Sequence, residues 1–257
     1  MTETNPVLTV TRSDRIAHVR LNRPGKRNAL NDELVAALDA FFSAVPEGTR
    51  AIVISGEGGN FSSGLDLSEQ VKREPLETMA HSRNWHRIMT GIRNSAIPVI
   101  AALDGAVMGG GLELAAVCHV RIAEETTRFQ MPEGLRGIFV GGGASVHLSR
   151  LIGPDRLTEM MLTGRVYAGA DGERLGLAHY LVAEGKALEL AFELAERVAR
   201  NSPTINGFVI QAISQIGNLP PEGGLYAESL AAALSLTGPD AEEGLKAFLE
   251  KRQPDFG

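Results

Sequence analysis

The chain of 257 residues is long enough to bury a large core, and its length fits one domain or one domain with an appendage. Its 44% hydrophobic and 22% charged residues are typical of a globular protein, and its net charge of −6 argues against non-specific binding to nucleic acid, which needs a basic face. Cys118 is the single cysteine, which excludes an intrachain disulfide and favours a reducing compartment.

Two further features of the sequence favour the cytoplasm. No apolar stretch approaches the length of a membrane span. Residues 1–6 lack the basic and apolar regions of a signal peptide. We therefore expect a cytoplasmic protein that binds neither a membrane nor nucleic acid.

The N-terminal part of the chain predicts a hairpin followed by a helix. Residues 7–11 and 16–21 alternate apolar and polar positions with period two around a polar turn, as the strands of a hairpin do. A basic, turn-rich loop follows at 22–28. Asn31 can cap the next helix, whose apolar side chains between 34 and 42 share one face.

The next elements are a strand, a loop and a helix. Residues 50–55 form a short apolar strand, and the loop 56–66 that follows is rich in glycine and serine. The polar segment 68–93 favours a helix with an irregular start at Pro75.

A glycine triplet, Gly109–Gly111, lies between an apolar run at 97–103 and a helical pattern that begins at Leu112. Bare backbone at this point lets a ligand reach main-chain N–H groups at a helix N-terminus, where the helix dipole favours negative charge. Close packing of helix on strand would explain the glycines equally well. Glu113, within one turn of the triplet, shifts the interpretation towards a functional site.

The remaining chain continues the alternation and then becomes helical. Residues 120–123 and 128–131 predict short strands, so strands recur with helical crossovers, which indicates an α/β fold with mostly parallel pairing. A second glycine run, Gly141–Gly143, opens another passage from loop to helix. Residues 186–200 form an amphipathic helix.

Three more helical stretches are predicted between residues 204 and 251. The segment Asn201–Pro203 is the best boundary before them. It divides the chain into an α/β core at 1–200 and a helical C-terminal region at 201–257.

Ordered motifs from about residue 7 to residue 256 resemble those of the crotonase superfamily, the enoyl-CoA hydratase/isomerase family. The motifs are Leu21–Pro24 with Asn28–Leu30, Phe61–Asp66, Pro98–Leu114, Met131–Glu133, Gly153, Leu162–Gly164, Gly176–Ala178 and Ala247–Arg252. Each is weak alone, whereas the ordered set is specific for the family. The resemblance implies an α/β fold with a crotonase-like ββα spiral core and a helical C-terminal region that packs trimers.

The resemblance also implies an active site that activates a thioester. Ser63 and Gly110 would supply the two N–H groups of an oxyanion hole for the thioester carbonyl. Glu113 would activate water, and Glu133 would pass a proton to the α-carbon. Gly141 matches a family glycine whose N–H helps to hold the water, although Val140 replaces the proline that usually precedes it.

Coenzyme A would bind along the same loops as part of the substrate, and the family resemblance implies no other cofactor and no metal. The residues implied in coenzyme A binding are Lys26, Arg27, Ala29, Ser62, Ser63 and Leu65, with Phe248 and Lys251 of a neighbouring subunit at the adenine end. Apart from the resemblance, the basic residues among them are expected to be solvated surface groups.

The acyl end of the substrate is expected near the predicted helix at 78–90. Spacings of four place His81, Trp85 and Met89 on one helical face. Trp85 and Met89 would wall the acyl pocket, or this face would simply pack on the core. The histidines show no spacing typical of metal ligands.

The function that these residues favour is an enoyl-CoA hydratase, a hydro-lyase of fatty acid metabolism. One alternative is a double-bond isomerase or another acyl-CoA lyase of the family, in which a single glutamate would shuttle the proton. A second is a non-catalytic relative that binds acyl-CoA or RNA. The apolar C-terminal helices favour a homotrimer or a dimer of trimers.

Overall fold

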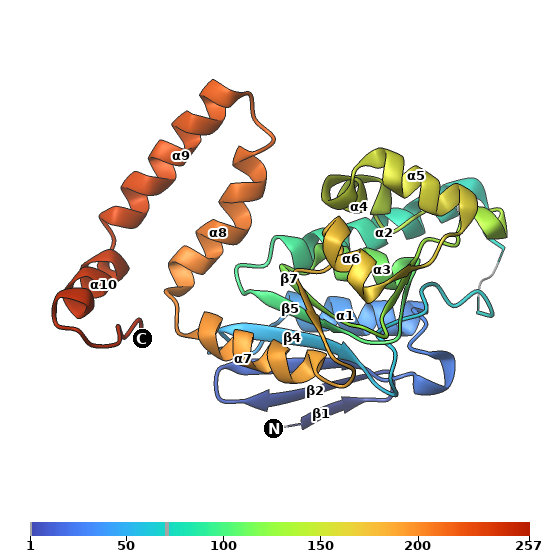
Figure 1. Ribbon diagram of the computed structural model, residues 1–257, viewed down its shortest axis with the longest axis horizontal. Coiled ribbons are helices and arrows are strands. Elements are labelled where there is room, and N and C mark those ends of the chain that lie inside the picture. Colours follow the sequence, from blue (N-terminus) through green and yellow to red (C-terminus); the bar gives the residue numbers. More distant parts are fainter. Residues whose placement is uncertain (1, 70–71) are drawn as a thin grey trace.

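A seven-stranded sheet forms the body of the protein in the computed structural model, which describes residues 2–69 and 72–257 (Figure 1). In spatial order its strands are β1 (Thr2–Asn5), β2 (Leu8–Ser13), β3 (Ile16–Leu21), β4 (Ala51–Gly56), β5 (Val99–Leu103), β7 (Val120–Glu124) and β10 (Tyr180–Val182). The pairs β1–β2 and β2–β3 are antiparallel, and every pairing from β3 to β10 is parallel. The fold is therefore mixed α/β, with the predicted hairpin at one edge of a parallel sheet.

A smaller sheet carries the glycine triplet. It consists of β6 (Ala106–Met108), β8 (Arg128–Gln130) and β9 (Tyr167–Ala168). Neither β6 nor β1 was predicted from the sequence. Because β6 is only three residues long, between Gly105 and Gly109, no periodic pattern marks it.

Helices cover both faces of the large sheet. They are α1 (Asp32–Ser43), α2 (Pro75–Arg93), α3 (Gly110–Val117), α4 (Ala144–Ile152), α5 (Pro154–Thr163), α6 (Gly169–Leu175) and α7 (Ala187–Ala199), with short 3₁₀ turns η1 (Pro24–Lys26) and η2 (Gly134–Arg136). The period-two alternation of β4 sends Ile52 and Ile54 into the core on the side of α1 to α4, whereas Ala51 and Val53 pack with α7. This burial of both faces explains the continuous apolar run in the sequence.

Two predicted helix starts are confirmed. Asn31 caps α1, because its Oδ1 accepts a hydrogen bond from the N–H of Leu34 at 3.0 Å. The helix α2 begins at Pro75, where Glu74 and Glu77 form a capping box.

The last three helices lie to one side of the sheet in Figure 1. They are α8 (Pro203–Ile216), α9 (Pro221–Leu236) and α10 (Pro239–Leu249), as the sequence predicted in number and place. Many of their apolar side chains are exposed: Val209, Ile213, Leu225, Tyr226, Leu230, Leu234, Leu236, Leu245, Phe248 and Leu249. The division of the chain at 200 stays a prediction. No helix of the described ranges is long and apolar enough to cross a membrane.

Candidate active site

Two glycine-containing turns meet at the N-terminus of α3. The loop after β4 is joined to β6 by hydrogen bonds, because Ser62 donates its N–H to Ala106 at 2.9 Å and accepts from Met108 at 3.0 Å. At Gly64, where φ is +91°, a Cβ would lie 3.1 Å from the backbone nitrogen of Gly110. Only a residue without a side chain allows the two backbones to approach this closely.

Two backbone N–H groups are free to donate at this junction. Those of Leu65 and Gly110 have no acceptor among residues 2–69 and 72–257. A Cβ placed on Gly110 would lie 3.5 Å from the nitrogen of Leu65, and both residues line one cavity. Each donor directly follows a glycine with positive φ, at 64 and 109 respectively. The arrangement offers paired donors to an oxygen that gains negative charge.

The structure corrects the expected role of Ser63. Its N–H donates to the carbonyl of Arg27 at 2.9 Å, and its hydroxyl donates to the carbonyl of Lys26 at 3.1 Å. Both groups are therefore used in fixing the loop. The N–H of Leu65, two residues later, has no such acceptor, and Leu65 pairs with Leu30 and lines the cavity.

Glu113 lies in the first turn of α3 and is buried. Its Oε1 accepts hydrogen bonds from the N–H of Gly142 at 3.0 Å and the N–H of Ala144 at 2.9 Å. Burial raises the pKa of Glu113, and these backbone donors oppose the rise because they favour the carboxylate. The second glycine run, Gly141–Gly143, therefore helps to hold the carboxyl group of Glu113, which follows the first glycine run.

Glu133 follows β8 at the start of η2 and lines the same cavity as Glu113. A Cβ on Gly109 would lie 2.7 Å from its Oε1. Its Oε2 is buried and has no hydrogen-bond partner in the described parts of the chain. Burial raises the pKa of Glu133 to about 7, and the neighbouring charge of Glu113 adds to the rise.

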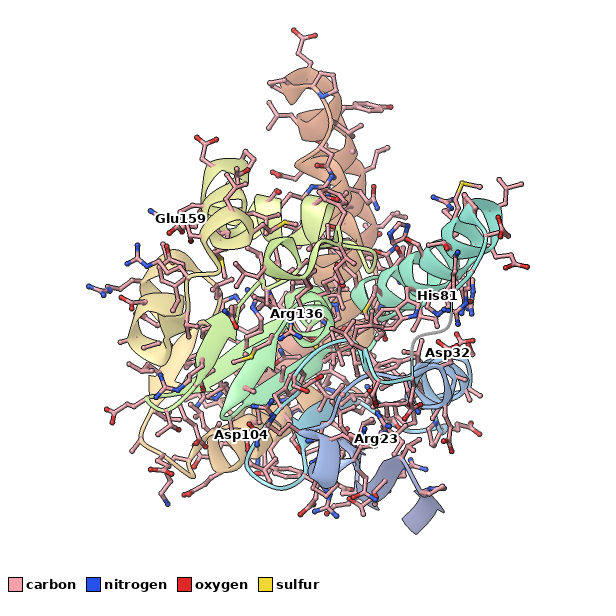
Figure 2. All side chains as sticks on the ribbon, turned by 90° about the vertical axis from the view of Figure 1, so that its right-hand side faces the viewer. Arg23, Asp32, His81, Asp104, Arg136 and Glu159 are labelled. Atoms are coloured by element: carbon pink, nitrogen blue, oxygen red, sulfur yellow. The ribbon has the colours of Figure 1, made fainter. Side chains whose placement is uncertain are left out.

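Trp85 forms one wall of this cavity, which has a volume of about 230 Å³. A Cβ on Gly110 would meet its indole ring at 3.3 Å, so the ring lies beside the free N–H. Met89 does not line the cavity. It packs in the core, which was the alternative to a role in the acyl pocket. His81 lines the cavity and is held by Asp32 of α1, whose Oδ1 lies 2.7 Å from its Nε2 (Figure 2).

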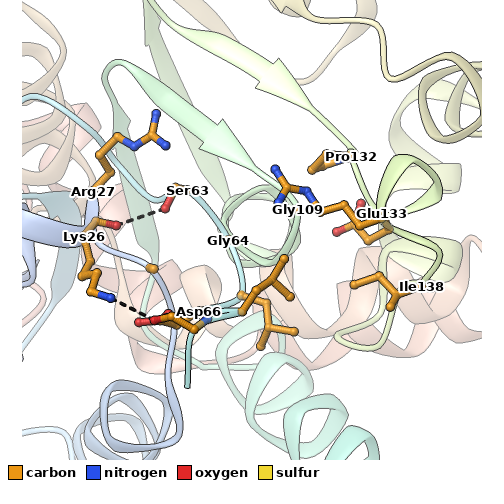
Figure 3. Close-up of a pocket in the computed structure, with 14 residues that line it drawn as sticks. Lys26, Arg27, Ser63, Gly64, Asp66, Gly109, Pro132, Glu133 and Ile138 are labelled. Atoms are coloured by element: carbon orange, nitrogen blue, oxygen red, sulfur yellow. Dashed lines mark hydrogen bonds between the residues drawn. The ribbon is translucent and has the colours of Figure 1, made fainter. Parts of the chain in front are cut away.

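A second cavity of about 270 Å³ adjoins the first and shares Leu65, Glu133 and Ile138 with it (Figure 3). The residues predicted for coenzyme A that line it are Lys26, Arg27, Ala29, Ser63 and Leu65; Ser62 is buried behind them. Arg136 also lines it and was missed, because it lies in no recognised motif. In the described chain neither Arg27 nor Arg136 forms an ion pair with a carboxylate.

Phe248 and Lys251 do not line either cavity of the chain that carries them. Both are exposed, Phe248 near the end of α10 and Lys251 just after it. Figure 1 shows α10 far to the side of the sheet away from α5 and α6. The expectation that they reach the substrate of a neighbouring subunit stays a prediction.

Other potentially reactive side chains are buried or hydrogen-bonded to the backbone. Cys118 is buried, which raises the pKa of its thiol to about 12 and makes it a poor nucleophile. His119 accepts from the N–H of Val99 at 2.9 Å, and its other ring nitrogen lies 2.9 Å from the carbonyl of Arg93. Within residues 2–69 and 72–257, no group of three or more potential ligands could hold a metal ion.

Comparisons with known proteins match nearly the whole chain. The model of the enoyl-CoA hydratase/isomerase family matches residues 11–257. The 2,3-dehydroadipyl-CoA hydratase of Escherichia coli (strain K12) is 34% identical over 253 residues, covering 97% of this chain and 98% of the relative.

Solved structures are similar over the same length. A provisionally named enoyl-CoA hydratase of Rhodopseudomonas palustris CGA009 has a TM-score of 0.94 and 48% identity, covering 98% of each chain. The enoyl-CoA hydratase of Bacillus anthracis has a TM-score of 0.91 and 30% identity, covering 97% of this chain and 98% of its own. The similarity includes α8 to α10 as well as the sheet.

Proposed function

Because the chain belongs to the enoyl-CoA hydratase/isomerase family, we propose that it adds water to a 2-enoyl-CoA thioester and catalyses the reverse loss of water. The observation that carries this proposal is the pairing of Glu113 and Glu133 in one cavity with two free backbone N–H groups. Acyl-CoA thioesters are the substrates on which the family acts.

The two N–H groups would bind the thioester oxygen. Adding hydroxide to the β-carbon moves charge through the conjugated system onto that oxygen. Leu65 and Gly110 are placed to donate to it, and the positive end of the α3 dipole supports them. A fixed donor of this kind typically contributes roughly 3–4 kcal/mol to the stability of a transition state. The proposal therefore assigns the oxyanion hole to Leu65 and Gly110 instead of Ser63 and Gly110.

The two glutamates would divide the proton transfers according to their surroundings. Glu113 accepts two backbone hydrogen bonds that favour its ionised form, so it is suited to remove a proton from water. Glu133 has an oxygen without a donor and a pKa of about 7, so it can hold the proton that the α-carbon receives. The β-carbon gains hydroxyl, the α-carbon gains the proton of Glu133, Glu113 ends protonated and Glu133 ends ionised. A proton then returns from Glu113 to Glu133, directly or through solvent, before the next turnover.

The adjoining cavity would hold the coenzyme A part of the substrate. Lys26, Arg27 and Arg136 give it a basic lining that suits phosphate groups. Since it shares Leu65 and Glu133 with the first cavity, a thioester bound there would present its carbonyl to the paired donors. No further cofactor is part of the proposal.

Isomerisation of the double bond is the second candidate. It needs one carboxyl group to take a proton from one carbon and return it to another. The lone Oε2 of Glu133 and the near-neutral pKa of its carboxyl group suit such a shuttle. Oxygen-18-labelled water separates the two reactions, because hydration puts the heavy oxygen into the product and isomerisation does not.

A panel of 2-enoyl-CoA esters tests both the activity and the acyl pocket. Wild-type protein should decrease the ultraviolet absorbance of the conjugated enoyl thioester, because hydration removes the double bond. Trp85→Ala should change the relative kcat/KM among acyl chains much more than it changes coenzyme A affinity, because Trp85 lies beside Gly110 at the reacting end. Met89→Ala is the core control and should mainly lower Tm. Equal losses for every ester in the Trp85 variant would make Trp85 a structural residue.

We also propose that copies of the chain associate through α8 to α10, as a trimer or a dimer of trimers. The exposed apolar side chains include Leu230, Leu234, Leu245 and Phe248, and water contact with so many is unfavourable. Light scattering at micromolar concentration should give a trimeric or hexameric mass. A stable monomer would contradict this proposal and would remove the role of Phe248 and Lys251 at a neighbouring site.

A further inference from the structure

The segment from Phe139 to Gly143 carries one of the N–H groups that hold Glu113; Val140 packs against the core, but the backbone of the segment makes few hydrogen bonds. Its start is tied down where the N–H of Ile138 donates to the carbonyl of Glu133 at 3.1 Å. Phe139 then points outward with 74% of its surface exposed. The N–H groups of Phe139, Val140 and Gly141 have no acceptor within the described chain.

Ser82 of α2 connects this segment to the helix by a side-chain hydrogen bond. Its hydroxyl donates to the carbonyl of Gly141 at 2.7 Å, the residue before the N–H that binds Glu113. The Nε2 of His86, one helical turn later, lies 3.5 Å from the same hydroxyl oxygen. A continuous set of contacts thus runs from α2 through Gly141 and Gly142 to the carboxylate of Glu113.

We propose that Ser82 is a positioning residue that fixes this glycine segment on α2 and so keeps the N–H of Gly142 on the carboxylate of Glu113. Its consequence for catalysis rests on the proposed hydratase function; its consequence for the carboxyl group does not. Ser82 would act through Gly142 and not as an acid or a base, because its proton is engaged by the Gly141 carbonyl.

Loss of the Ser82 hydroxyl should raise the pKa of Glu113. If the segment loosens, the N–H of Gly142 lies farther from Oε1 on average, and the ionised form of Glu113 loses part of its stabilisation. The pKa of Glu113 should then rise above its already raised value. Because the proposed base must be ionised, the acid limb of the rate profile should move to higher pH.

Other titratable groups surround this region and must be separated from Glu113. They are His81 and His86 on α2, Glu133 at the start of η2 and His147 on α4. Burial and the charges of Arg93 and Arg150 lower the pKa of His147 to about 4, so it stays neutral near neutral pH. Because the charge of Glu113 also shifts Glu133, the infrared titration is made in a Glu133→Gln background, where subtracting the spectrum of the double variant Glu113→Gln/Glu133→Gln leaves the carboxyl group of Glu113.

The test compares Ser82→Ala, Ser82→Thr and the control Thr90→Ala. Thr90 is exposed on the same helix, so its variant removes a hydroxyl without touching the segment. We expect Ser82→Ala to lower kcat by at least about tenfold, since displacing a reacting group by about 1 Å can cost on the order of 100-fold. KM should stay close to its wild-type value, and the acid limb of the rate profile should move to higher pH. Ser82→Thr should restore both kcat and the position of the acid limb.

The outcomes separate the possible roles of Ser82. A higher KM with unchanged kcat and unchanged pH profile would make Ser82 only a wall of the cavity and would overturn the proposal. A lower Tm with unchanged kcat and pH profile would make it merely structural and would also overturn the proposal. If wild-type protein hydrates no enoyl-CoA, the proposed function fails, and the infrared pKa of Glu113 in Ser82→Ala still decides the positioning role.

Discussion

Replacing Glu133 or Glu113 with Gln should lower the turnover of a 2-enoyl-CoA by about 10²–10⁴-fold, the usual contribution of a placed acid or base. Both exchanges preserve side-chain shape, so the fold should persist. Oε1 of a glutamine at 113 can still accept from Gly142 and Ala144, which separates loss of the base from loss of packing. Steady-state kinetics with circular dichroism and Tm measures both effects.

The double variant tests whether the two carboxyl groups act as one unit. If they do, it should lose little beyond either single variant. The wild-type rate should fall as pH rises through about 7, where Glu133 loses the proton that it must deliver, and the residual activity of Glu133→Gln should lack this fall. Near-wild-type hydration by either single variant would rule out the two-glutamate mechanism.

Gly142→Ala should reduce kcat by roughly 100-fold, because the new methyl group would displace the Glu113 carboxylate. A Cβ on Gly142 would overlap Oε2 of Glu113 and lie 3.2 Å from the indole of Trp85. Gly142 is not among the glycines with positive φ, so the backbone itself accommodates alanine. Kinetics of the variant on the best ester of the panel measures the loss.

Gly91→Ala is the matched control for this substitution. Gly91 lies in α2, and a Cβ there would have no neighbour within 4 Å. Alanine in a helix interior is more favourable than glycine by roughly 0.5–1 kcal/mol, so this variant should keep its activity and gain slightly in Tm. Full activity of Gly142→Ala would show that the position of the Glu113 carboxylate does not limit the reaction.

The fold could be predicted where local patterns determine it. The hairpin of β2 and β3 alternates with period two, and α1 has an amphipathic face with Asn31 as its cap. By contrast, β6 is too short to produce a pattern, and β1 has neither an apolar run nor a regular alternation. The family resemblance carried the prediction of the overall architecture, which the matching structures support.

The candidate site depends on contacts that sequence spacing does not encode. Glu113 and Glu133 lie on different elements, in α3 and before η2, and only the tertiary fold brings both into one cavity. The engagement of the Ser63 N–H has a local cause. The direction of an N–H in an irregular loop depends on its neighbours, and here Ser63 donates to Arg27 whereas Leu65 pairs with Leu30.

One signal in the sequence could have located the second donor. Both free N–H groups follow a glycine with positive φ, Leu65 after Gly64 in the loop after β4 and Gly110 after Gly109 between β6 and α3. A positive φ at the glycine turns the next N–H out of the ladder of backbone hydrogen bonds. Arg136 had no comparable signal, because its place at the cavity depends on the course of η2.

The central claim is that this site adds water across the double bond of an enoyl-CoA. The direct measurement is to incubate wild-type protein with a 2-enoyl-CoA in oxygen-18-labelled water and analyse the product by mass spectrometry. The account predicts a 3-hydroxyacyl-CoA that carries the heavy oxygen, formed at a rate that Glu113→Gln and Glu133→Gln each lower by about 10²–10⁴-fold. An unlabelled product with a shifted double bond, or an unchanged substrate, would contradict it.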